Sequence, residues 1–272
     1  MHPFLLDWVI GGFHLKIPTY GFLLATAFSV GYLMALKRAV KLDISTKHVE
    51  NFFLITVLGS VFGARLFHVI FEEFSYYWAH PAKILAIWEG GYTFYGAFLS
   101  SLFFMYLYTR IKKISFLDMM DICTPGGALG LFIGRMGCFF AGCCWGKASS
   151  VPWAVAFNAP ETLSPSGHVR VHPTQVYEAL VGLVVFFYLQ RRFKHRKYSG
   201  QIFLEAITFY SLARFGIEFF RGDDYRGYLF GGLLSYSQFI SLAILPFTLS
   251  AIILFSKKVQ RPNKNSSKTR KS

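Results

Sequence analysis

Seven apolar stretches run through this chain, and each is long enough to cross a bilayer as an α-helix. About 20 helical residues span the ~30 Å of hydrocarbon. A soluble protein of 272 residues is rarely 54% hydrophobic and 19% aromatic, so the fold that we expect is all-α and polytopic. We place the seven transmembrane helices near residues 18–36, 50–71, 92–109, 118–141, 173–190, 201–220 and 234–255.

The fourth stretch is the least regular of the seven. It contains Pro125 and a pair of glycines directly after it, which mark a place where a helix would break. In lipid such a break is tolerated only where the freed backbone groups face protein or a cavity.

Basic residues are unevenly distributed among the loops, and this sets the expected orientation. Nineteen of the 28 Lys and Arg residues lie after stretches one, three and five or in the C-terminal tail. Because cytoplasmic loops are the basic ones, we predict an outside N-terminus and a cytoplasmic C-terminus. The net charge of +14 then reflects topology and attraction to membrane lipids, and without a recognition motif we expect no nucleic-acid partner. Residues 1–256 are predicted to form one seven-helix domain, and residues 257–272 a basic, disordered tail.

Three arginines lie where hydrocarbon should be. Arg65, Arg135 and Arg214 each fall in the outer half of a helix that runs outward in this topology. A charge at membrane depth is costly and is normally kept for a functional reason, and the planar guanidinium suits phosphate. The sequence therefore predicts a site for an anionic head group. Depth brings further polar residues to the same layer: Tyr20, Tyr95, His172, Gln175, Glu178, Tyr210, Glu218 and Arg221.

The sixth stretch places several of these residues on one helix face. Tyr210, Arg214, Glu218 and Arg221 are spaced four, four and three residues apart. A structural ion pair between Arg214 and Glu218 is the simpler interpretation of this spacing. However, Glu178 and Glu218 are the only carboxylates at matching depth, and the resulting deficit of negative charge is what an anionic lipid would fill.

The cysteines allow three interpretations. Cys138, Cys143 and Cys144 form a C-x4-C-C pattern that does not have zinc-ribbon spacing. Small residues are common where membrane helices pack closely, and we prefer this interpretation. An outward-facing disulfide and a metal site are the alternatives. We expect neither a metal nor a cofactor.

A series of motifs, in order, resembles the bacterial prolipoprotein diacylglyceryl transferase family along nearly the whole chain. The motifs are Tyr20-Gly21, Gly63–Leu66, Gly90–Gly96, Asp121, Gly134–Gly146, His172–Glu178 and Arg214–Arg221. The resemblance implies a multi-pass enzyme of the bacterial cytoplasmic (inner) membrane whose site faces the outer leaflet. Such an enzyme moves the diacylglyceryl group of phosphatidylglycerol to the lipobox cysteine thiol of a preprolipoprotein. Glycerol 1-phosphate is released in this first step of lipoprotein maturation.

The resemblance also implies roles for individual residues. Arg135 and Arg214 correspond to the essential arginines of the family, Tyr20 and Tyr210 to its important tyrosines, and Gly146 to its signature glycine. On this basis the predicted catalytic residues are Arg135, Arg214, Tyr95, Tyr210 and Glu218. The predicted substrate-binding residues are Tyr20, Arg65, Gly146, His172, Gln175, Glu178 and Arg221.

The chain departs from the family pattern at the predicted chemistry. The family usually has His where Tyr95 stands, Asn where Cys138 stands and Glu where Cys143 stands. The proton of the acceptor thiol then goes to Tyr95, Glu218 or His172, or the thiol ionises in the positive field. Two broader alternatives stay open: a divergent paralogue with another acceptor, and a lipid- or anion-binding protein or transporter. A transporter should show two pseudo-symmetric halves, and none are evident.

Overall fold

The computed structural model describes residues 3–11, 13–86, 88, 90–158, 162, 169–222 and 227–260. The chain forms two compact units. The first comprises residues 1–34 and 120–272, and the second comprises residues 35–119.

Seven long helices lie at the predicted positions. They are α1 (Thr19–Val40), α2 (Thr46–Phe67), α4 (Phe94–Ile111), α5 (Phe116–Ala141), α6 (Thr174–Phe193), α7 (Gln201–Glu218) and α8 (Tyr236–Gln260). Within the described part of the chain, four segments are long and apolar enough to cross a membrane: α1, α5, α8, and α2 with the π-helical turn η1 (His68–Glu72). The helical membrane character is confirmed. That α4, α6 and α7, with 18, 20 and 18 residues, also span the bilayer stays a prediction.

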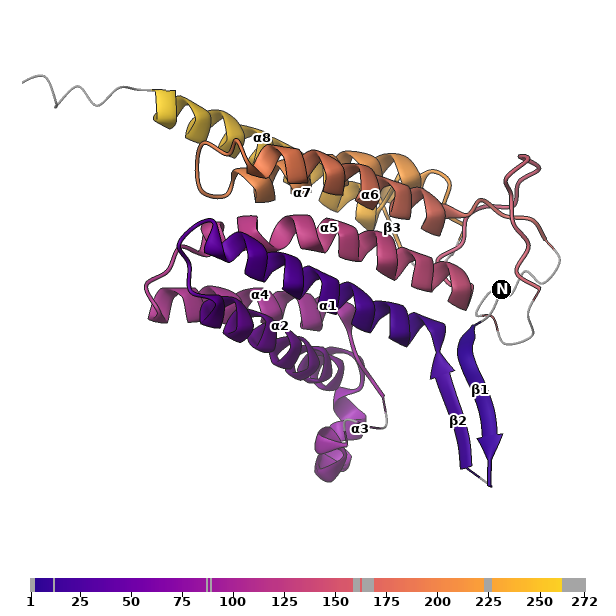
Figure 1. Cartoon of the computed structure of the whole chain (residues 1–272). Helices are drawn as coiled ribbons and strands as arrows, with labels where there is room; N and C mark the ends of the chain where they lie inside the picture. Colours follow the sequence, from indigo (N-terminus) through magenta and orange to yellow (C-terminus); the bar gives the residue numbers. More distant parts are fainter. Residues whose placement is uncertain are drawn as a thin grey trace, which may run out of the picture. The chain divides into compact units, whose positions relative to one another are not determined.

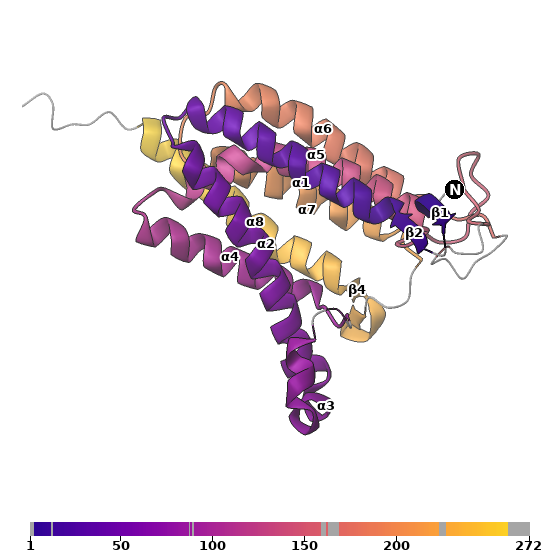
Figure 2. The ribbon, with the colours of Figure 1, turned by 60° about the horizontal axis from the view of Figure 1, so that its bottom comes forward.

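The first unit is a bundle in which glycines allow close helix crossings. Helix α7 packs against both α6 and α8 (Figures 1 and 2). A Cβ atom on Gly126 of α5 would lie 2.9 Å from the carbonyl oxygen of Gly31 in α1. A Cβ on Gly182 of α6 would lie 2.9 Å from the carbonyl oxygen of Ala128 in α5. Small residues let helix backbones approach in a membrane, so these glycines set the spacing of α1, α5 and α6.

The fourth stretch, the least regular in the sequence, forms one helix, α5. The helix continues through Pro125 to Ala141. Proline removes one backbone hydrogen bond, but neighbouring helices make such a loss tolerable in a membrane helix. The contacts of Gly126 with α1 and of Ala128 with α6 directly after the proline supply this support.

A buried carboxylate fixes the start of α7. Asp121 of α5 has no exposed surface. Its Oδ1 accepts a hydrogen bond from the backbone N–H of Phe203 at 2.9 Å, and its Oδ2 accepts one from that of Gly200 at 2.9 Å. Arg196 pairs with Oδ2 at 2.9 Å. The first N–H groups of a helix have no partner within the helix, so Asp121 caps α7 from a neighbouring helix.

The all-α prediction missed four short strands. At the N-terminus, β1 (Phe4–Ile10) pairs antiparallel with β2 (Phe13–Pro18), and the register sets Ile10 opposite Phe13. In the sequence two glycines separate the two strands, which is a common composition for a two-residue hairpin turn. Further along, β3 (Tyr228–Leu229) and β4 (Leu234–Ser235) flank the short helix η5 (Phe230–Gly232) and lead into α8.

The second unit is built on the pairing of α2 with α4. Gly63 and Gly96 face one another across this crossing, and a Cβ on either would collide with the backbone oxygen of the other. The π-helical turn η1 continues α2 into α3 (Phe74–Ala79) and the short helix η2 (Pro81–Leu85). Glycine is thus required at the crossing itself.

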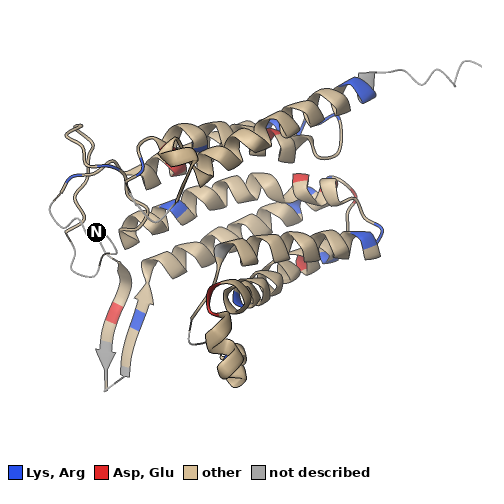
Figure 3. Cartoon of the chain, turned by 180° about the vertical axis from the view of Figure 1, so that it is seen from behind, with Lys and Arg blue, Asp and Glu red and all other residues tan. Residues whose placement is uncertain are grey.

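Charge is sparse along the helices, and Lys and Arg gather toward the C-terminal end of α8 (Figure 3). Helix α8 continues to Gln260, so the first residues of the predicted tail are helical rather than disordered. The rest of that tail, residues 261–272, lies outside the described residues.

Candidate active site

Glu178 lies at the centre of a cluster of buried charges in the first unit. It follows the first turn of α6, and 1% of its side chain is exposed. Its Oε2 pairs with Nη2 of Arg135 at 2.6 Å. Its Oε1 pairs with Nη1 of Arg214 at 2.8 Å and with Nη1 of Arg221 at 3.5 Å. One carboxylate therefore holds three guanidinium groups, from α5, from α7 and from the segment after α7.

Arg214 has a second acid at the predicted spacing. Its Nη2 pairs with Oε2 of Glu218, one turn further along α7, at 2.8 Å, and donates to Oγ of Ser237 in α8 at 3.2 Å. The cluster thus contains three guanidinium groups and two carboxylates. The acids are the more deeply buried members, with side-chain exposures of 1% and 2% against 20% for Arg135 and 13% for Arg214. The accessible edge of the cluster is therefore positive.

Two of the predicted tyrosines belong to the same region. Tyr210 lies one turn before Arg214 on α7 and interacts electrostatically with both Arg135 and Arg214. Tyr20 is at the start of α1, and its ring would lie 3.2 Å from a Cβ on Gly137 of α5. Arg135 acts on this tyrosine as well. Because 42% of Tyr20 is exposed, Tyr20 is the more accessible of the two hydroxyl groups to a ligand.

Gly146 occupies a crossing of three backbone segments. Its N–H donates to the carbonyl oxygen of His172 at 2.9 Å. A Cβ at this position would lie 2.6 Å from that oxygen and 2.6 Å from the carbonyl oxygen of Phe220. Gly222 packs back against Gly146 with the same lack of room. The structure therefore gives Gly146 a packing role, and its predicted contact with substrate stays a prediction.

His172 and Gln175 each have a protein partner. The Nδ1 atom of His172 lies 2.9 Å from the hydroxyl oxygen of Tyr177, which accepts a hydrogen bond from Nε1 of Trp153 at 2.7 Å. Gln175 is fully buried, and its Nε2 donates to the carbonyl oxygen of Cys143 at 2.6 Å. Among the residues that the structure covers, the Oε1 atom of Gln175 has no hydrogen-bond donor.

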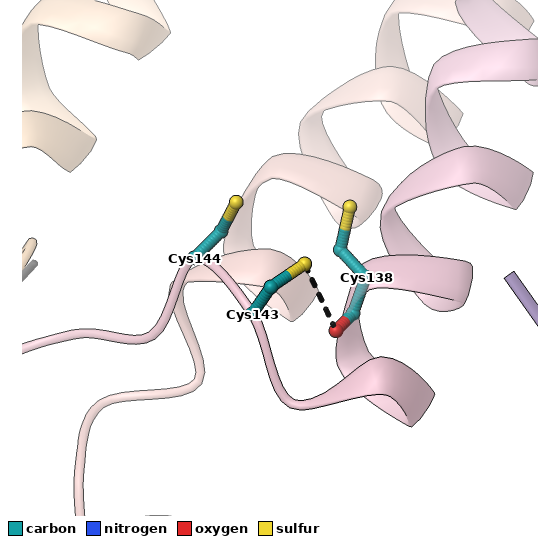
Figure 4. A group of neighbouring side chains, drawn as sticks. All are labelled: Cys138, Cys143 and Cys144. Atoms are coloured by element: carbon teal, nitrogen blue, oxygen red, sulfur yellow. Dashed lines mark hydrogen bonds between the residues drawn. The ribbon is translucent and has the colours of Figure 1, made fainter. Parts of the chain in front are cut away.

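Three cysteines lie together beside this cluster. Cys138 is in the last turn of α5, and Cys143 and Cys144 follow the helix end, with all three sulfur atoms within 4.8 Å of one another (Figure 4). The pKa of the Cys144 thiol is lowered by hydrogen bonding to the thiols of Cys138 and Cys143 and, in addition, by the charges of Arg221 and Arg135. All three cysteines have free thiols in the structure.

Arg65 and Tyr95 belong to the second unit. The guanidinium of Arg65 donates to the carbonyl oxygens of Ile84 at 3.1 Å, Lys83 at 2.6 Å and Gly90 at 2.6 Å. These contacts show an arginine that holds the segment between α3 and α4, and its binding of substrate stays a prediction. Tyr95 lies in the first turn of α4 and is 57% exposed.

Sequence reasoning did not single out three residues that support the cluster. The Oγ atom of Ser237 in α8 accepts a hydrogen bond from Arg214, and the sequence gives no signal for this position, because serine is ordinary in apolar helices. Thr174 donates to the carbonyl oxygen of Cys144 at 2.8 Å, and Tyr177 holds His172. Both lie inside the motif that ends at Glu178, so the motif itself could have indicated them.

The chain is similar to known transferases over most of its length. The sequence pattern of the prolipoprotein diacylglyceryl transferase family matches residues 8–255. A phosphatidylglycerol–prolipoprotein diacylglyceryl transferase of Geobacter sulfurreducens is 33% identical over 252 residues, covering 92% of this chain and 95% of that protein. A protein of the same name from Bordetella avium is 35% identical, covering 92% of this chain and 93% of that protein. Another from Clostridium tetani is 34% identical, covering 85% of this chain and 90% of that protein. The predicted resemblance is confirmed, and the chain belongs to the prolipoprotein diacylglyceryl transferase family.

Proposed function

We propose that this protein transfers the diacylglyceryl group of phosphatidylglycerol to the lipobox cysteine thiol of a preprolipoprotein and releases glycerol 1-phosphate. The observation that carries the proposal is the charge cluster of Arg135, Arg214, Arg221, Glu178 and Glu218. Its two carboxylates are almost fully buried, whereas the side chains of Arg135 and Arg214 are 20% and 13% exposed. Family membership supplies the reaction class.

Arg135 and Arg214 bind the phosphate group in this proposal. Both guanidinium groups are ion-paired with Glu178, Arg135 at 2.6 Å and Arg214 at 2.8 Å, and Arg214 also donates a hydrogen bond to it. The remaining N–H donors are available for phosphate oxygens, for which the guanidinium fork is well suited. The carbon–oxygen bond of the lipid breaks as the thiol attacks, and negative charge grows on the phosphate. Preoriented cations at that position stabilise the transition state.

Glu178 and Glu218 are then orienting groups. Each carboxylate is almost fully buried and is ion-paired with arginine. Because the Glu218 carboxylate is engaged with Arg214 at 2.8 Å, its proposed part is to orient that guanidinium. Tyr95 stays the proposed proton acceptor or phosphate partner, at the position of the family histidine. Tyr20, Tyr210, His172 and Gln175 complete the proposed lipid site.

The membrane arrangement belongs to the same proposal. All seven long helices cross the cytoplasmic membrane of a bacterium, with the N-terminus outside and the site toward the outer leaflet. The apolar character of α1, α2, α5 and α8 supports this arrangement, and so does the concentration of basic residues in alternate loops.

The test removes the phosphate-binding arginines. Arg135→Ala and Arg214→Ala should each lower transfer by at least 100-fold, because the loss of one donor to a developing oxyanion costs about 10²–10³ in rate. Lys at either position should rescue poorly, because an ammonium group lacks the bidentate fork. The assay presents a lipobox peptide and phosphatidylglycerol vesicles to the full-length protein and measures the lipidated peptide by mass spectrometry.

Arg192→Ala is the matched control. Arg192 is also an arginine in a helix of the first unit, and it pairs with Glu205 at 3.1 Å, away from Glu178. This variant should keep most of the activity. Full transfer by either site variant would remove that arginine from the mechanism. Release of glycerol 1-phosphate without lipidated peptide would favour another acceptor.

A further inference from the structure

The three clustered cysteines have the arrangement of a metal site, and among the residues that the structure describes no fourth ligand accompanies them. Their sulfur atoms all lie within 4.8 Å of one another, and they come from one helix end and the loop that follows it (Figure 4). Zinc holds thiolate sulfur at about 2.3 Å with tetrahedral geometry, which places sulfur atoms roughly 3.8 Å apart. If rotation of the side chains shortened the distances between the sulfur atoms by about 1 Å, all three could bind one ion.

The backbone around these cysteines is held from several sides. The N–H of Cys143 donates to the carbonyl oxygen of Cys138 at 3.2 Å, which turns the chain back on the end of α5. Cys144 has a φ of 62°, a conformation that is uncommon for a residue with a side chain. The carbonyl oxygens of Cys143 and Cys144 accept hydrogen bonds from Gln175 and Thr174, which are both fully buried. The loop is thus preorganised from α6, as ligand loops require.

The charge around the cysteines suits a thiolate-bound ion. Three thiolates and a divalent cation leave one negative charge in excess. Arg135 and Arg221 both act electrostatically on Cys144 with positive charge. Soft sulfur ligands select zinc over magnesium or calcium, which prefer oxygen.

We infer that Cys138, Cys143 and Cys144 bind a zinc ion whose fourth position accepts the thiol of the acceptor cysteine. The zinc ion goes beyond the sequence-based expectation of a protein without metal. Three protein ligands and an open position are typical of catalytic zinc, whereas structural zinc has four protein ligands. The second half of the inference rests on the proposed function, because it requires a thiol as the acceptor.

The chemistry is a substitution at carbon. On coordination the acceptor thiol loses its proton to water, since a metal-bound thiol is deprotonated. Its sulfur attacks the carbon of the diacylated glycerol that bears the phosphate. A carbon–sulfur bond forms there as the bond from this carbon to the phosphate oxygen breaks. The electron pair leaves with the oxygen of glycerol 1-phosphate, beside Arg135 and Arg214. The thiolate is the nucleophile, so the ion ionises the acceptor thiol, and Tyr95 then has the second of its two proposed roles, as a partner of the phosphate. No electrons are exchanged with an external partner.

The first experiment measures metal content. The full-length protein is purified under reducing conditions, and its zinc content is measured by inductively coupled plasma mass spectrometry. We expect about one zinc per chain in the parent and a loss of at least tenfold in Cys138→Ser, Cys143→Ser and Cys144→Ser. Cys123→Ser, in the same helix α5 but outside the three-sulfur group, is the matched control and should keep the metal. Thermal melting separates metal loss from unfolding.

The second experiment reports the ligands and the open position. Protein loaded with Co²⁺ should show sulfur-to-cobalt charge-transfer absorption, and this band should grow when a lipobox peptide with a free thiol is added. A peptide with serine in place of that cysteine should leave it unchanged. Absence of zinc in a folded, reduced parent protein, or a disulfide between two of the three cysteines in the active protein, would overturn the inference.

These outcomes are distinguishable from failure of the proposed function. Transfer by a metal-free parent protein would overturn the zinc site and leave the transferase activity intact. Bound zinc and a cobalt band that responds to the peptide, without any lipidated product, would support the site and contradict the proposed reaction. A cobalt band that ignores the peptide thiol would overturn the role of the fourth position.

Discussion

Replacement of Glu178 by Gln tests the charge cluster most directly, because one carboxylate there faces three arginines. The substitution keeps the shape of the side chain and one oxygen acceptor but removes the negative charge. Among the carboxylates that the structure describes in the cluster, Glu218 then remains beside Arg135, Arg214 and Arg221. Breaking a buried ion pair from one side costs about 3–5 kcal/mol, since an uncompensated charge is left in a poorly solvated position.

That free energy corresponds to a large shift in melting temperature. At roughly 2–4 °C per kcal/mol for a chain of this size, Glu178→Gln should lower the melting temperature by roughly 6–20 °C. Glu205→Gln is the matched control. Glu205 is also buried, but the arginine that it faces, Arg192 at 3.1 Å, has a side chain that is 37% exposed, and Tyr188 and Gln201 donate further hydrogen bonds to Glu205. Glu205→Gln leaves one half-exposed guanidinium rather than three buried ones without this carboxylate, so this variant should lose clearly less in melting temperature than Glu178→Gln.

The assay is thermal unfolding of the detergent-solubilised protein, followed by tryptophan fluorescence. A double variant, Glu178→Gln with Arg135→Gln, restores the original balance of charge in the cluster. It should therefore be more stable than Glu178→Gln alone, although it carries one more substitution. The reasoning about buried charge is refuted if Glu178→Gln and Glu205→Gln have the same melting temperature. It is also refuted if the double variant is the least stable of the set.

Three further predictions concern packing, the base and topology. Gly146→Ala should destabilise by about 2 kcal/mol, because the new Cβ would lie 2.6 Å from two carbonyl oxygens, whereas Gly216→Ala, with nothing within 4 Å, should be neutral in the same melting assay. Tyr95→Phe should lower transfer strongly and Tyr95→His should retain it with a pH optimum moved toward the imidazole range; an active Phe variant would make Tyr95 a packing residue. Reporter fusions after Lys113 and Lys197 should behave as cytoplasmic, and a periplasmic signal at either would contradict the proposed orientation.

The helices were predictable because hydropathy acts over whole segments. In lipid each apolar stretch must hydrogen-bond its own backbone in a helix of about 20 residues. Its position therefore follows from composition alone. The N-terminal hairpin was missed because a search for apolar segments of about 20 residues passes over strands of six or seven. The signal was present: two glycines stand between short runs rich in β-branched and aromatic residues. Continuity through Pro125 depends on contacts with α1 and α6, which the sequence does not show.

The sequence gives the position of each candidate residue along its helix but not the direction of its side chain. Counting residues from the helix ends places Arg65, Arg135 and Arg214 in one layer, but it does not say which way each side chain points. The spacing of four residues does fix direction along one helix, and the predicted pair of Arg214 with Glu218 is present at 2.8 Å. The central role of Glu178 depends on the arrangement of α5, α6 and α7 around it. Arg65, at matching depth, donates to backbone carbonyl oxygens instead.

The acids in the cluster bear on how the proposed phosphate site would discriminate between the bound lipid and the transition state. Phosphatidylglycerol carries one negative charge at its phosphodiester, and Glu178 and Glu218 offset part of the positive charge of the arginines with which they pair. In the proposed mechanism the lipid is therefore bound without being held too tightly. As the carbon–oxygen bond breaks, a second negative charge develops on the phosphate, and the attraction to Arg135 and Arg214 then exceeds that in the bound lipid. Interactions that strengthen toward the transition state raise the rate, whereas equally strong binding of the substrate does not. Without Glu178 and Glu218 the same arginines would hold the bound lipid and the released glycerol 1-phosphate more tightly, so release of the product would be slower.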